Sequence, residues 1–213
     1  MKDCIIITSV IQTANKPLNY SETRSIYSHQ QRFEQTLETI ESVRKCMPDV
    51  HILLIECSPP SEWMDTLKSK VDQFINLEFN EIVNNSLEKG LGEKTLLLHA
   101  LYSLKEEYAN IYKITGRYVL IDNWHFNISK WRETDQLTFC KTDYCYGLKD
   151  AIHTFFYRIP NSKLSLFKEV LNEYDGTKCI ENFFTDKFKN QITFIDIIGI
   201  QVRWACHDEI QYF

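Results

Sequence analysis

The stretch that decides the fold is CIIITSV, residues Cys4–Val10, a run of apolar and β-branched side chains close to the amino terminus. A run without polar alternation is typical of a strand that is buried on both faces, as in a parallel sheet. A second run of this kind, VHILLI, covers Val50–Ile55. We predict two central, neighbouring strands from these segments.

The segment between these runs has the pattern of a helix over residues 31–46. Apolar side chains recur there at helical spacing: Phe33, Leu37, Ile40 and Val43. Ser28 and Gln31 match a capping box at its start, and Pro48 follows its end. The start of the chain therefore reads as strand, helix, strand.

The remaining elements are predicted in the same way from periodicity and turn residues. We expect helices at 62–74, 94–108, 163–174 and 179–188, and strands at 78–83, 110–115, 136–140, 151–159, 191–200 and 202–206. Regular alternation in the first half predicts an α/β fold with a mainly parallel central sheet flanked by helices. The irregular second half predicts a smaller antiparallel addition, and the whole chain reads as a single domain.

Composition excludes several classes of protein. The chain has 213 residues, of which 44% are hydrophobic and 25% charged, and 6 glycines with 5 prolines are too few for a fibrous or low-complexity chain. A net charge of -5 argues against a general nucleic-acid binder. The apolar run at the amino terminus is too short for a signal peptide or a membrane span. Seven cysteines without a CxxC pair predict reduced thiols in a cytosol-like compartment.

Ligands of open α/β sheets bind beyond the carboxyl ends of the strands. Those ends carry small, hydroxylic or charged side chains: Thr8, Ser9 and Val10, then Glu56, then Thr115, Gly116 and Arg117. This composition favours a polar ligand. The alternative is that the strands simply end in polar loops, as most strands do.

The segment KGLGEK, Lys89–Lys94, precedes a predicted helix and suits a phosphate, because glycines allow close backbone approach and helix N-termini favour anions. It matches neither GxxxxGK[ST] nor GxGxxG. Arg32, Lys113 and Arg117 could add positive charge, and an arginine held at a strand end can bind phosphate through two bonds. A plain glycine-containing helix entry and an ordinary salt bridge of Arg117 are the alternatives.

Glu181 lies in CIENFFTDKF, at the start of a short aromatic helix. Apolar surroundings raise the pKa of a carboxyl, which would suit a general base. The alternative is an acid placed to interact with the helix dipole. The sequence has neither an HExxH motif nor a GxSxG motif.

The order of four segments resembles that of the motifs of GT-A fold glycosyltransferases, including viral enzymes that decorate capsid glycans. The segments are IIITSVI, LLIECS, EKGLGEK and YKITGRYVL. SHQQRFEQTLETIESV resembles the first helix of such enzymes. The resemblance extends over essentially the whole chain. The sequence ends at IQYF without a tail-like segment, and we therefore expect it to be the amino-terminal part of a longer protein.

The resemblance implies a UDP-sugar donor. Thr8–Val10 would line the nucleobase and ribose site, Glu56 would face uridine, and Glu181 would be the base. Donor-binding residues would be Thr8, Ser9, Val10, Arg32, Glu56, Gly90, Leu91, Gly92, Glu93, Lys94, Thr115, Gly116 and Arg117. Residues 1–120 would form the nucleotide-sugar half and residues 121–213 the acceptor half.

The sequence departs from the family at its metal motif. Asp-x-Asp normally holds Mn²⁺ or Mg²⁺ against the diphosphate, whereas Thr115–Arg117 contains no carboxylate. The resemblance leaves two solutions: a divalent cation held by Asp122 or His207, or Arg117 in place of the metal. Either would neutralise the leaving group.

The expected function is transfer of a hexose or deoxyhexose from a UDP-sugar to a hydroxyl of a glycan acceptor, with inversion, in the host cytoplasm if the protein is viral. One alternative is a nucleotidyltransferase that makes a nucleotide sugar, although the loop QTANKPLNYSETR lacks the glycines expected after its first strand. The other is a non-catalytic nucleotide-sugar-binding domain, which the missing Asp-x-Asp favours.

Overall fold

The computed structural model describes residues 1–105, 107–121, 128–145, 148–195, 199–206 and 209–212. The strands are β1 (Cys4–Ser9), β2 (His51–Glu56), β3 (Gln73–Asn76), β4 (Asn110–Thr115), β5 (Val119–Leu120), β6 (Leu137–Cys145), β7 (Leu148–Pro160), β8 (Ile192–Ile195), β9 (Ile200–Arg203) and β10 (Ile210–Tyr212). The helices are α1 (His29–Cys46), α2 (Glu62–Lys68), α3 (Glu81–Asn85), α4 (Lys89–Ser103), α5 (Ile128–Trp131), α6 (Leu164–Glu173) and α7 (Ile180–Phe188), with a 3₁₀ turn at Asn161–Lys163.

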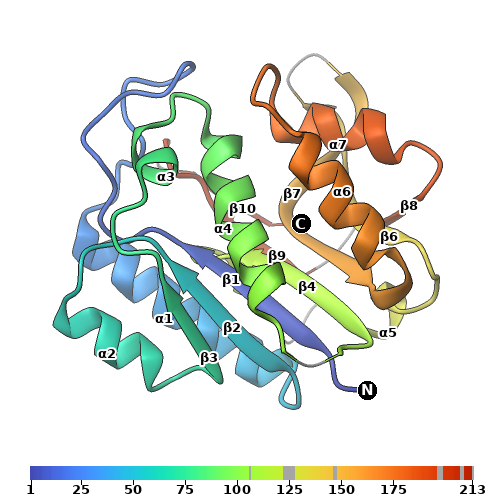
Figure 1. The fold of residues 1–213 in the computed structure, drawn as a ribbon, viewed down its shortest axis with the longest axis horizontal. Coiled ribbons are helices and arrows are strands. Elements are labelled where there is room, and N and C mark those ends of the chain that lie inside the picture. The colour runs from blue at the N-terminus through green and yellow to red at the C-terminus, as the bar shows by residue number, and fades with distance from the viewer. Residues whose placement is uncertain (106, 122–127, 146–147, 196–198, 207–208, 213) are drawn as a thin grey trace.

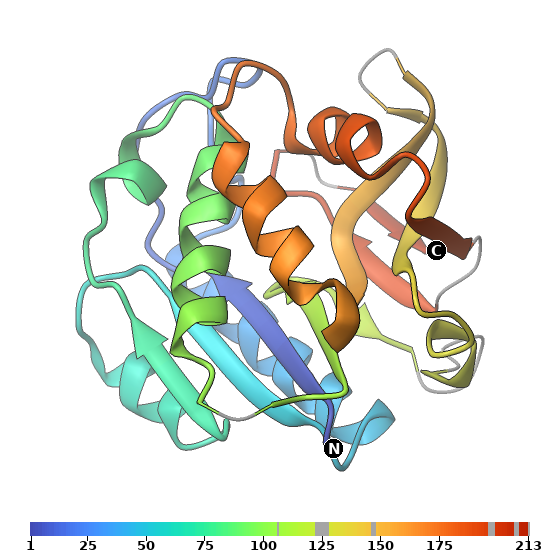
Figure 2. The same ribbon diagram turned by 45° about the vertical axis from the view of Figure 1, so that its right-hand side comes forward.

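The strands form a large mixed sheet and a small antiparallel one (Figures 1 and 2). The large sheet has seven strands in the order β3-β2-β1-β4-β7-β6-β8. Its first four strands are parallel, β7 runs antiparallel to both of its neighbours, and β8 is parallel to β6. The small sheet has the order β10-β9-β5. This architecture confirms the predicted fold class.

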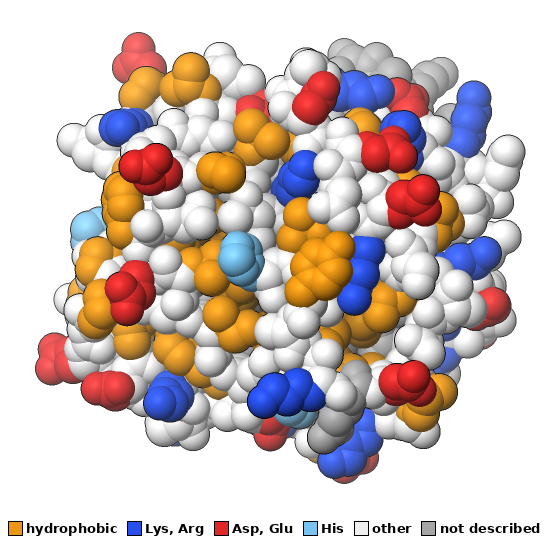
Figure 3. Space-filling view, in the orientation of Figure 1, with side chains coloured by type: hydrophobic (Ala, Val, Ile, Leu, Met, Phe, Trp, Pro, Cys, Tyr) orange, Lys and Arg blue, Asp and Glu red, His pale blue; other side chains and the backbone are white. Residues whose placement is uncertain are grey.

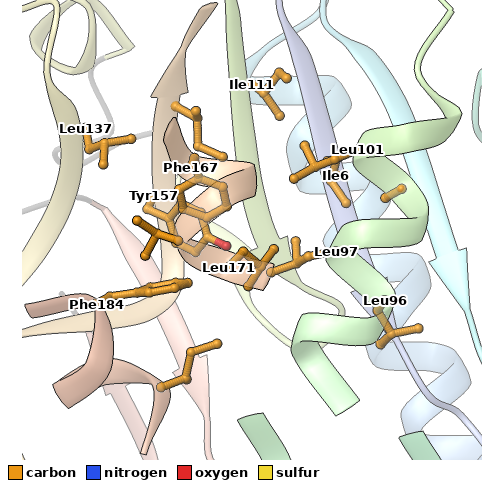
Figure 4. Packing of buried hydrophobic residues seen from close by; sticks show 14 of the residues in the cluster. Ile6, Leu96, Leu97, Leu101, Ile111, Leu137, Tyr157, Phe167, Leu171 and Phe184 are labelled. Carbon is orange, nitrogen blue, oxygen red and sulfur yellow. The ribbon is translucent and has the colours of Figure 1, made fainter. Parts of the chain in front are cut away.

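Side chains of each central strand alternate between two cores, as the pleat of a strand requires. Ile6 packs with α4, α6 and α7 on one face of the sheet, and Figure 4 shows Leu97 and Leu101 of α4 beside it. Ile5 and Ile7 pack on the other face with α1, α2 and the small sheet. Because β1, β2 and β4 are parallel, their polar carboxyl ends meet at one edge of the sheet.

Helix α1 begins as the capping box predicts. The Ser28 hydroxyl accepts a hydrogen bond from the Gln31 amide, and the Gln31 side chain accepts one from the Ser28 amide. These bonds satisfy donors that the first turn of a helix otherwise leaves unpaired. The helix therefore starts at a fixed place beside the end of β1.

The prediction for residues 62–83 is wrong in part. Helix α2 ends at Lys68, β3 occupies residues within the predicted helix, and the strand expected at 78–83 is absent from this fully described segment. Glu78 has a φ of 52°, which interrupts an extended chain. Asn80 then caps α3 by accepting from the Ile82 and Val83 amides. Local capping overrides the apolar pattern there.

The expected loop before α4 is also shorter than predicted, because the helix begins at Lys89 and not at Lys94. The Glu88 side chain caps it by accepting from the Gly90 amide. A Cβ on Gly90 would lie 2.4 Å from the Tyr174 hydroxyl, and one on Gly92 would lie 3.3 Å from Val83 Cα. Both glycines therefore permit close packing of the first turns of the helix.

Phe184 tests how much the aromatic core under α7 contributes to stability. It is fully buried and lies against Phe139, Phe167 and Phe188. We predict that Phe184→Ala lowers the free energy of unfolding by about 3–5 kcal/mol, the usual cost of truncating a buried phenylalanine. Phe194, which is 40% exposed, is the control, and Phe194→Ala should cost under about 1 kcal/mol. Equal effects in urea unfolding would contradict this core.

Candidate functional site

A cleft opens where β1 and β4 end, above the first turn of α4. It consists of a small cavity of about 90 Å³ and a larger one of about 720 Å³. The two share five lining residues: Lys89, Glu93, Thr115, Arg117 and Ala205. They therefore form one continuous space at the edge of the sheet where α/β proteins bind ligands.

The small cavity is lined by the polar end of β1 and by a group of cations. Thr8, Ser9 and Val10 lie on its wall. Its cationic lining residues, which we call the cation cluster, are Arg24, Arg32, Lys89 and Arg117. Glu93 is the one carboxylate among its described lining residues. The cavity is thus suited to an anion.

Arg32 is directed into this cavity by α1 and is only 5% exposed. Its Nε donates to the Val10 carbonyl at 2.7 Å and one terminal nitrogen donates to the Ser25 hydroxyl at 3.1 Å. Both acceptors are neutral, so the guanidinium is oriented without being neutralised. Burial, followed by the nearby charge of Arg117, lowers the pKa of Arg32 to about 9.

Arg117 follows β4 and is 4% exposed. Gly116 precedes it because a Cβ there would lie 3.1 Å from the Ser9 Cβ, at the end of β1. The guanidinium lies over the Tyr118 ring, 5.4 Å from its centroid, and Nε reaches the Arg203 carbonyl at 3.4 Å. In the described chain no carboxylate oxygen lies within 4 Å of it, which excludes the ordinary salt bridge with any described residue.

Lys89 and Arg24 complete the cation cluster. Lys89 is exposed toward the open cleft, and the surrounding protein, with Arg117 as the next cause, lowers its pKa to about 8. The side chain still meets solvent, so this pKa reflects crowding by protein and cations. Arg24 donates to the Ser86 carbonyl, while its Nε is buried without a partner in the described structure.

Glu93 offsets the cation cluster only in part, because its carboxylate is paired with a lysine outside the cluster. Its carboxylate lies 2.5 Å from Nζ of Lys113, whose side chain is 1% exposed. Lys113 also donates to the Thr115 hydroxyl and to the Thr154 carbonyl. Burial lowers the pKa of Lys113, and Glu93 opposes that shift. This ion pair joins α4, β4 and β7 at the floor of the cleft.

Glu181 lies in the larger cavity, on the first turn of α7. Its carboxylate accepts a 2.7 Å hydrogen bond from the Thr154 hydroxyl on β7. Burial raises the pKa of Glu181, and the hydrogen bond from Thr154 opposes the shift. A carboxyl in this state can exchange a proton nearer to neutral pH than an exposed one.

An aromatic wall lines the larger cavity beside Glu181. We define it by Tyr118, His153, Phe155 and Trp204. The rings of His153 and Phe155 are 4.6 Å apart, and those of His153 and Trp204 are 6.5 Å apart. Burial lowers the pKa of His153 to about 4, so this imidazole is neutral at pH 7. Such a wall suits the faces of a flat or sugar-like ligand.

Several residues predicted to bind the donor do not line either cavity. Glu56 is fully buried and accepts from the Ile11 amide, the Cys57 amide and the Ser58 hydroxyl. It organises the loops after β1 and β2, and its contact with uridine stays a prediction. Lys94 donates to the carbonyls of Asn172 and Tyr174. Leu91 packs against the core, and Gly116 is buried under Arg117.

The other predicted residues divide between the two cavities. Gly90 lines the larger one, Gly92 lines the small one, and Thr115 lines both. The sequence reasoning missed Arg24, Thr154 and the aromatic wall. Arg24 lies in a long polar loop, Thr154, His153 and Phe155 lie on β7, and Tyr118 and Trp204 lie next to the ends of strands. No local motif marks any of them.

The metal candidates Asp122 and His207 lie outside the described residues. Among the residues that are described, no group of three His, Cys, Asp or Glu side chains could hold a metal ion. At the position implied for Asp-x-Asp, the structure has the Thr115 hydroxyl, a buried glycine and the Arg117 guanidinium. This donor set does not suit a divalent cation, since it offers no carboxylate and places a cation there.

No protein-family model and no curated protein matches the chain. Solved structures do: the glycosyltransferase GlyE of Streptococcus pneumoniae matches with 10% identity and a TM-score of 0.52, over 92% of this chain and 45% of GlyE. LgtC, a galactosyltransferase, matches with 11% identity and a TM-score of 0.53, over 90% of this chain and 72% of LgtC. A nucleoside-diphosphate-sugar pyrophosphorylase from Vibrio cholerae matches with 13% identity and a TM-score of 0.54, over 94% of this chain and 95% of the pyrophosphorylase.

These likenesses establish the fold and no closer relationship. The chain has the GT-A-like architecture that glycosyltransferases share with enzymes that make nucleotide sugars, and it spans less than half the length of GlyE. The comparisons identify no specific viral protein. Within the described chain, none of the helices combines the length and the apolar character of a membrane span.

Replacing Arg117 tests whether the small cavity holds a diphosphate. We predict that Arg117→Ala weakens UDP binding by about 1.5–3 kcal/mol, the range for charge-assisted hydrogen bonds. Arg44→Ala, which removes a surface arginine paired with Asp72, should leave the affinity unchanged. Isothermal titration calorimetry measures both, and an unaltered dissociation constant for Arg117→Ala would remove Arg117 from the site.

Proposed function

We propose that the protein is a glycosyltransferase that uses a nucleotide-diphosphate sugar, with UDP as the nucleotide. One observation carries the proposal: a single cleft joins the cation cluster at one end to the Glu181 carboxylate at the other. The cations suit the diphosphate leaving group, and the carboxylate suits removal of a proton from an acceptor hydroxyl. The GT-A-like fold is compatible with this assignment.

The donor would lie across the ends of β1 and β4. Thr8, Ser9 and Val10 line the cavity next to Arg32, so the nucleoside would rest against the end of β1. The diphosphate would face Arg117 and Lys89 in the shared part of the cleft. This position directs the sugar into the larger cavity, toward Glu181.

The reaction would be a direct displacement. Glu181 would take the proton from the acceptor hydroxyl, whose oxygen forms a bond to the anomeric carbon while the bond from that carbon to the phosphate oxygen breaks. The nucleoside diphosphate leaves with the electron pair of the broken bond. The hydrogen bond from Thr154 would hold the carboxylate in place, and a single displacement inverts the anomeric centre.

The acceptor would enter through the larger cavity. Trp204 and His153 present aromatic faces there, and such faces suit the apolar faces of sugar rings. We therefore propose a glycan acceptor, with residues 1–120 as the donor half and residues 121–213 as the acceptor half. The described lining residues come from both halves.

A nucleotidyltransferase is the second candidate, favoured by the position of Arg24 in the loop after β1, on the wall of the small cavity. Such an enzyme would join a nucleoside triphosphate to a sugar 1-phosphate and release pyrophosphate. Incubation with UTP and a set of sugar 1-phosphates, followed by a pyrophosphate assay, separates the two. Pyrophosphate release without sugar transfer from UDP-sugars would establish the second candidate.

Glu181→Gln tests the base, because glutamine keeps the shape of the side chain and removes its basicity. We predict that donor affinity stays within about twofold, whereas sugar transfer or donor hydrolysis falls about 100-fold or more. Asp186→Asn is the matched control, since Asp186 lies on the same helix, is exposed and pairs with Lys178. Turnover of Glu181→Gln within a few-fold of wild type would place the base elsewhere.

A further inference from the structure

The cation cluster offers more positive charge than a metal-assisted diphosphate site requires. We infer that Arg24, Arg32, Lys89 and Arg117 neutralise the donor diphosphate directly, so that the site binds it without a divalent cation. The inference rests on the proposed function for the identity of the ligand. The resemblance to GT-A enzymes did not indicate Arg24 or Lys89 as donor-binding residues. It indicated Arg32 and Arg117 only as part of the general donor site.

The first step is the charge balance of the cavity. In the described chain, no carboxylate oxygen lies within 4 Å of a nitrogen of any member of the cation cluster, and Glu93 is already paired with Lys113. Arg32 and Arg117 are both more than nine-tenths buried. Buried charge without a counter-charge is costly, so this site gains most from an anionic ligand.

Several guanidinium nitrogens of the cation cluster have no hydrogen-bond partner among the described residues. Nε of Arg24 is buried without a partner in the described structure. Arg32 uses Nε and one terminal nitrogen, so the other terminal nitrogen has no partner among the described residues. The guanidinium of Arg117 makes only long hydrogen bonds, of 3.4 Å to the Arg203 carbonyl and 3.5 Å to the Tyr118 hydroxyl. Guanidinium groups in this state can each bind two phosphate oxygens.

The third step is the helix that begins at the cleft. Lys89 is the first residue of α4, which has 15 residues, and the amino end of a helix of this length carries a partial positive charge. The Glu88 carboxylate already caps this end by accepting from the Gly90 amide, so the helix end itself is not left for a ligand. Lys89 lines both cavities and has no carboxylate oxygen within 4 Å in the described chain, and a divalent cation beside its ammonium would be repelled.

The cation cluster lies in a protein that is not basic overall. On the face seen in Figure 3, acidic and basic side chains are interspersed over the surface. The chain as a whole carries a net charge of -5. The cation cluster is therefore not one part of a generally basic protein, and it selects for a compact, highly charged anion.

Pyrophosphate tests the cluster without assuming a nucleotide. Its binding to the full chain is measured by calorimetry in EDTA and again with Mn²⁺, for wild type, Lys89→Met and the control Lys68→Met. Lys68 is an exposed lysine on α2 that does not line the cleft. We expect wild type to bind in EDTA, with an affinity that Mn²⁺ changes less than about threefold. Lys89→Met should weaken binding about tenfold, as expected for the loss of one charge-assisted contact, and Lys68→Met by less than twofold.

In the pyrophosphate experiment, the inference would be overturned by no binding in EDTA, by binding that appears only with Mn²⁺, or by equal affinities for Lys89→Met and Lys68→Met. The proposed function is tested separately, by UDP binding and sugar transfer in the same buffers. Pyrophosphate binding in EDTA without any nucleotide-dependent activity would leave the anion site in place and refute the glycosyltransferase. Sugar transfer that requires Mn²⁺ would support the enzyme and refute the inference.

Discussion

Crowding of like charges at one edge of the sheet is the constraint on which the site depends. Arg32 and Arg117 are buried side by side, and Lys89 faces the same space. Such an arrangement would spread apart in a flexible loop. Here α1, β4 and α4 fix the backbone of each cation, and the two cores on either side of β1 prevent those elements from moving. The stability of the sheet is what allows the cations to remain close in the absence of a ligand.

The end of the cleft that holds Glu181 depends on a different kind of support. Glu181 lies on the first turn of α7, whose buried Phe183 and Phe184 anchor the helix to the aromatic core. Thr154 reaches its carboxylate from the neighbouring β7. Between the two ends, the Lys113–Glu93 pair spans the floor of the cleft. The charged groups at the floor are thus paired with each other, whereas the cations on the wall of the small cavity have no carboxylate oxygen within 4 Å in the described chain.

The sequence predicted the elements that are fixed by local patterns. The two buried strands, the capping box of α1 and the strand that leads to Arg117 follow from runs of apolar residues and from cap chemistry. It could not indicate what tertiary packing decides: Gly90 and Gly92 also allow Tyr174 and Val83 to approach α4, while their contact with a phosphate stays a prediction. Strand β5 was missed because two residues carry no periodicity.

Within the site, position could be predicted better than orientation. Arg117 and Glu181 were found because each ends or begins a clear element. Glu56 was placed correctly at the end of β2, but its carboxylate turns inward to three loop donors, which no sequence pattern indicates. Arg24 and Trp204 come from distant parts of the chain, and only the fold brings them to one cleft.

The crowding of cations in the cleft is tested most directly by the free energy of unfolding of wild type and Lys89→Met, each without added ligand, as the pH rises. The pKa of Lys89 is lowered from 10.5 to about 8, chiefly by the surrounding protein and then by Arg117, with Arg32 acting in the same direction and Cys206 and Glu93 opposing it. Between these two pKa values the unfolded wild type binds more protons than the folded wild type. The wild type therefore gains stability relative to the variant as the pH rises.

We predict that Lys89→Met is the more stable protein at pH 7 and that its advantage shrinks as the pH rises from about 8 toward 10.5. The buried thiols of Cys4 and Cys57, whose pKa values are raised, act in the opposite direction but are common to both proteins and cancel in the difference. A difference that does not change with pH, or a variant that is less stable than wild type at pH 7, would contradict the account.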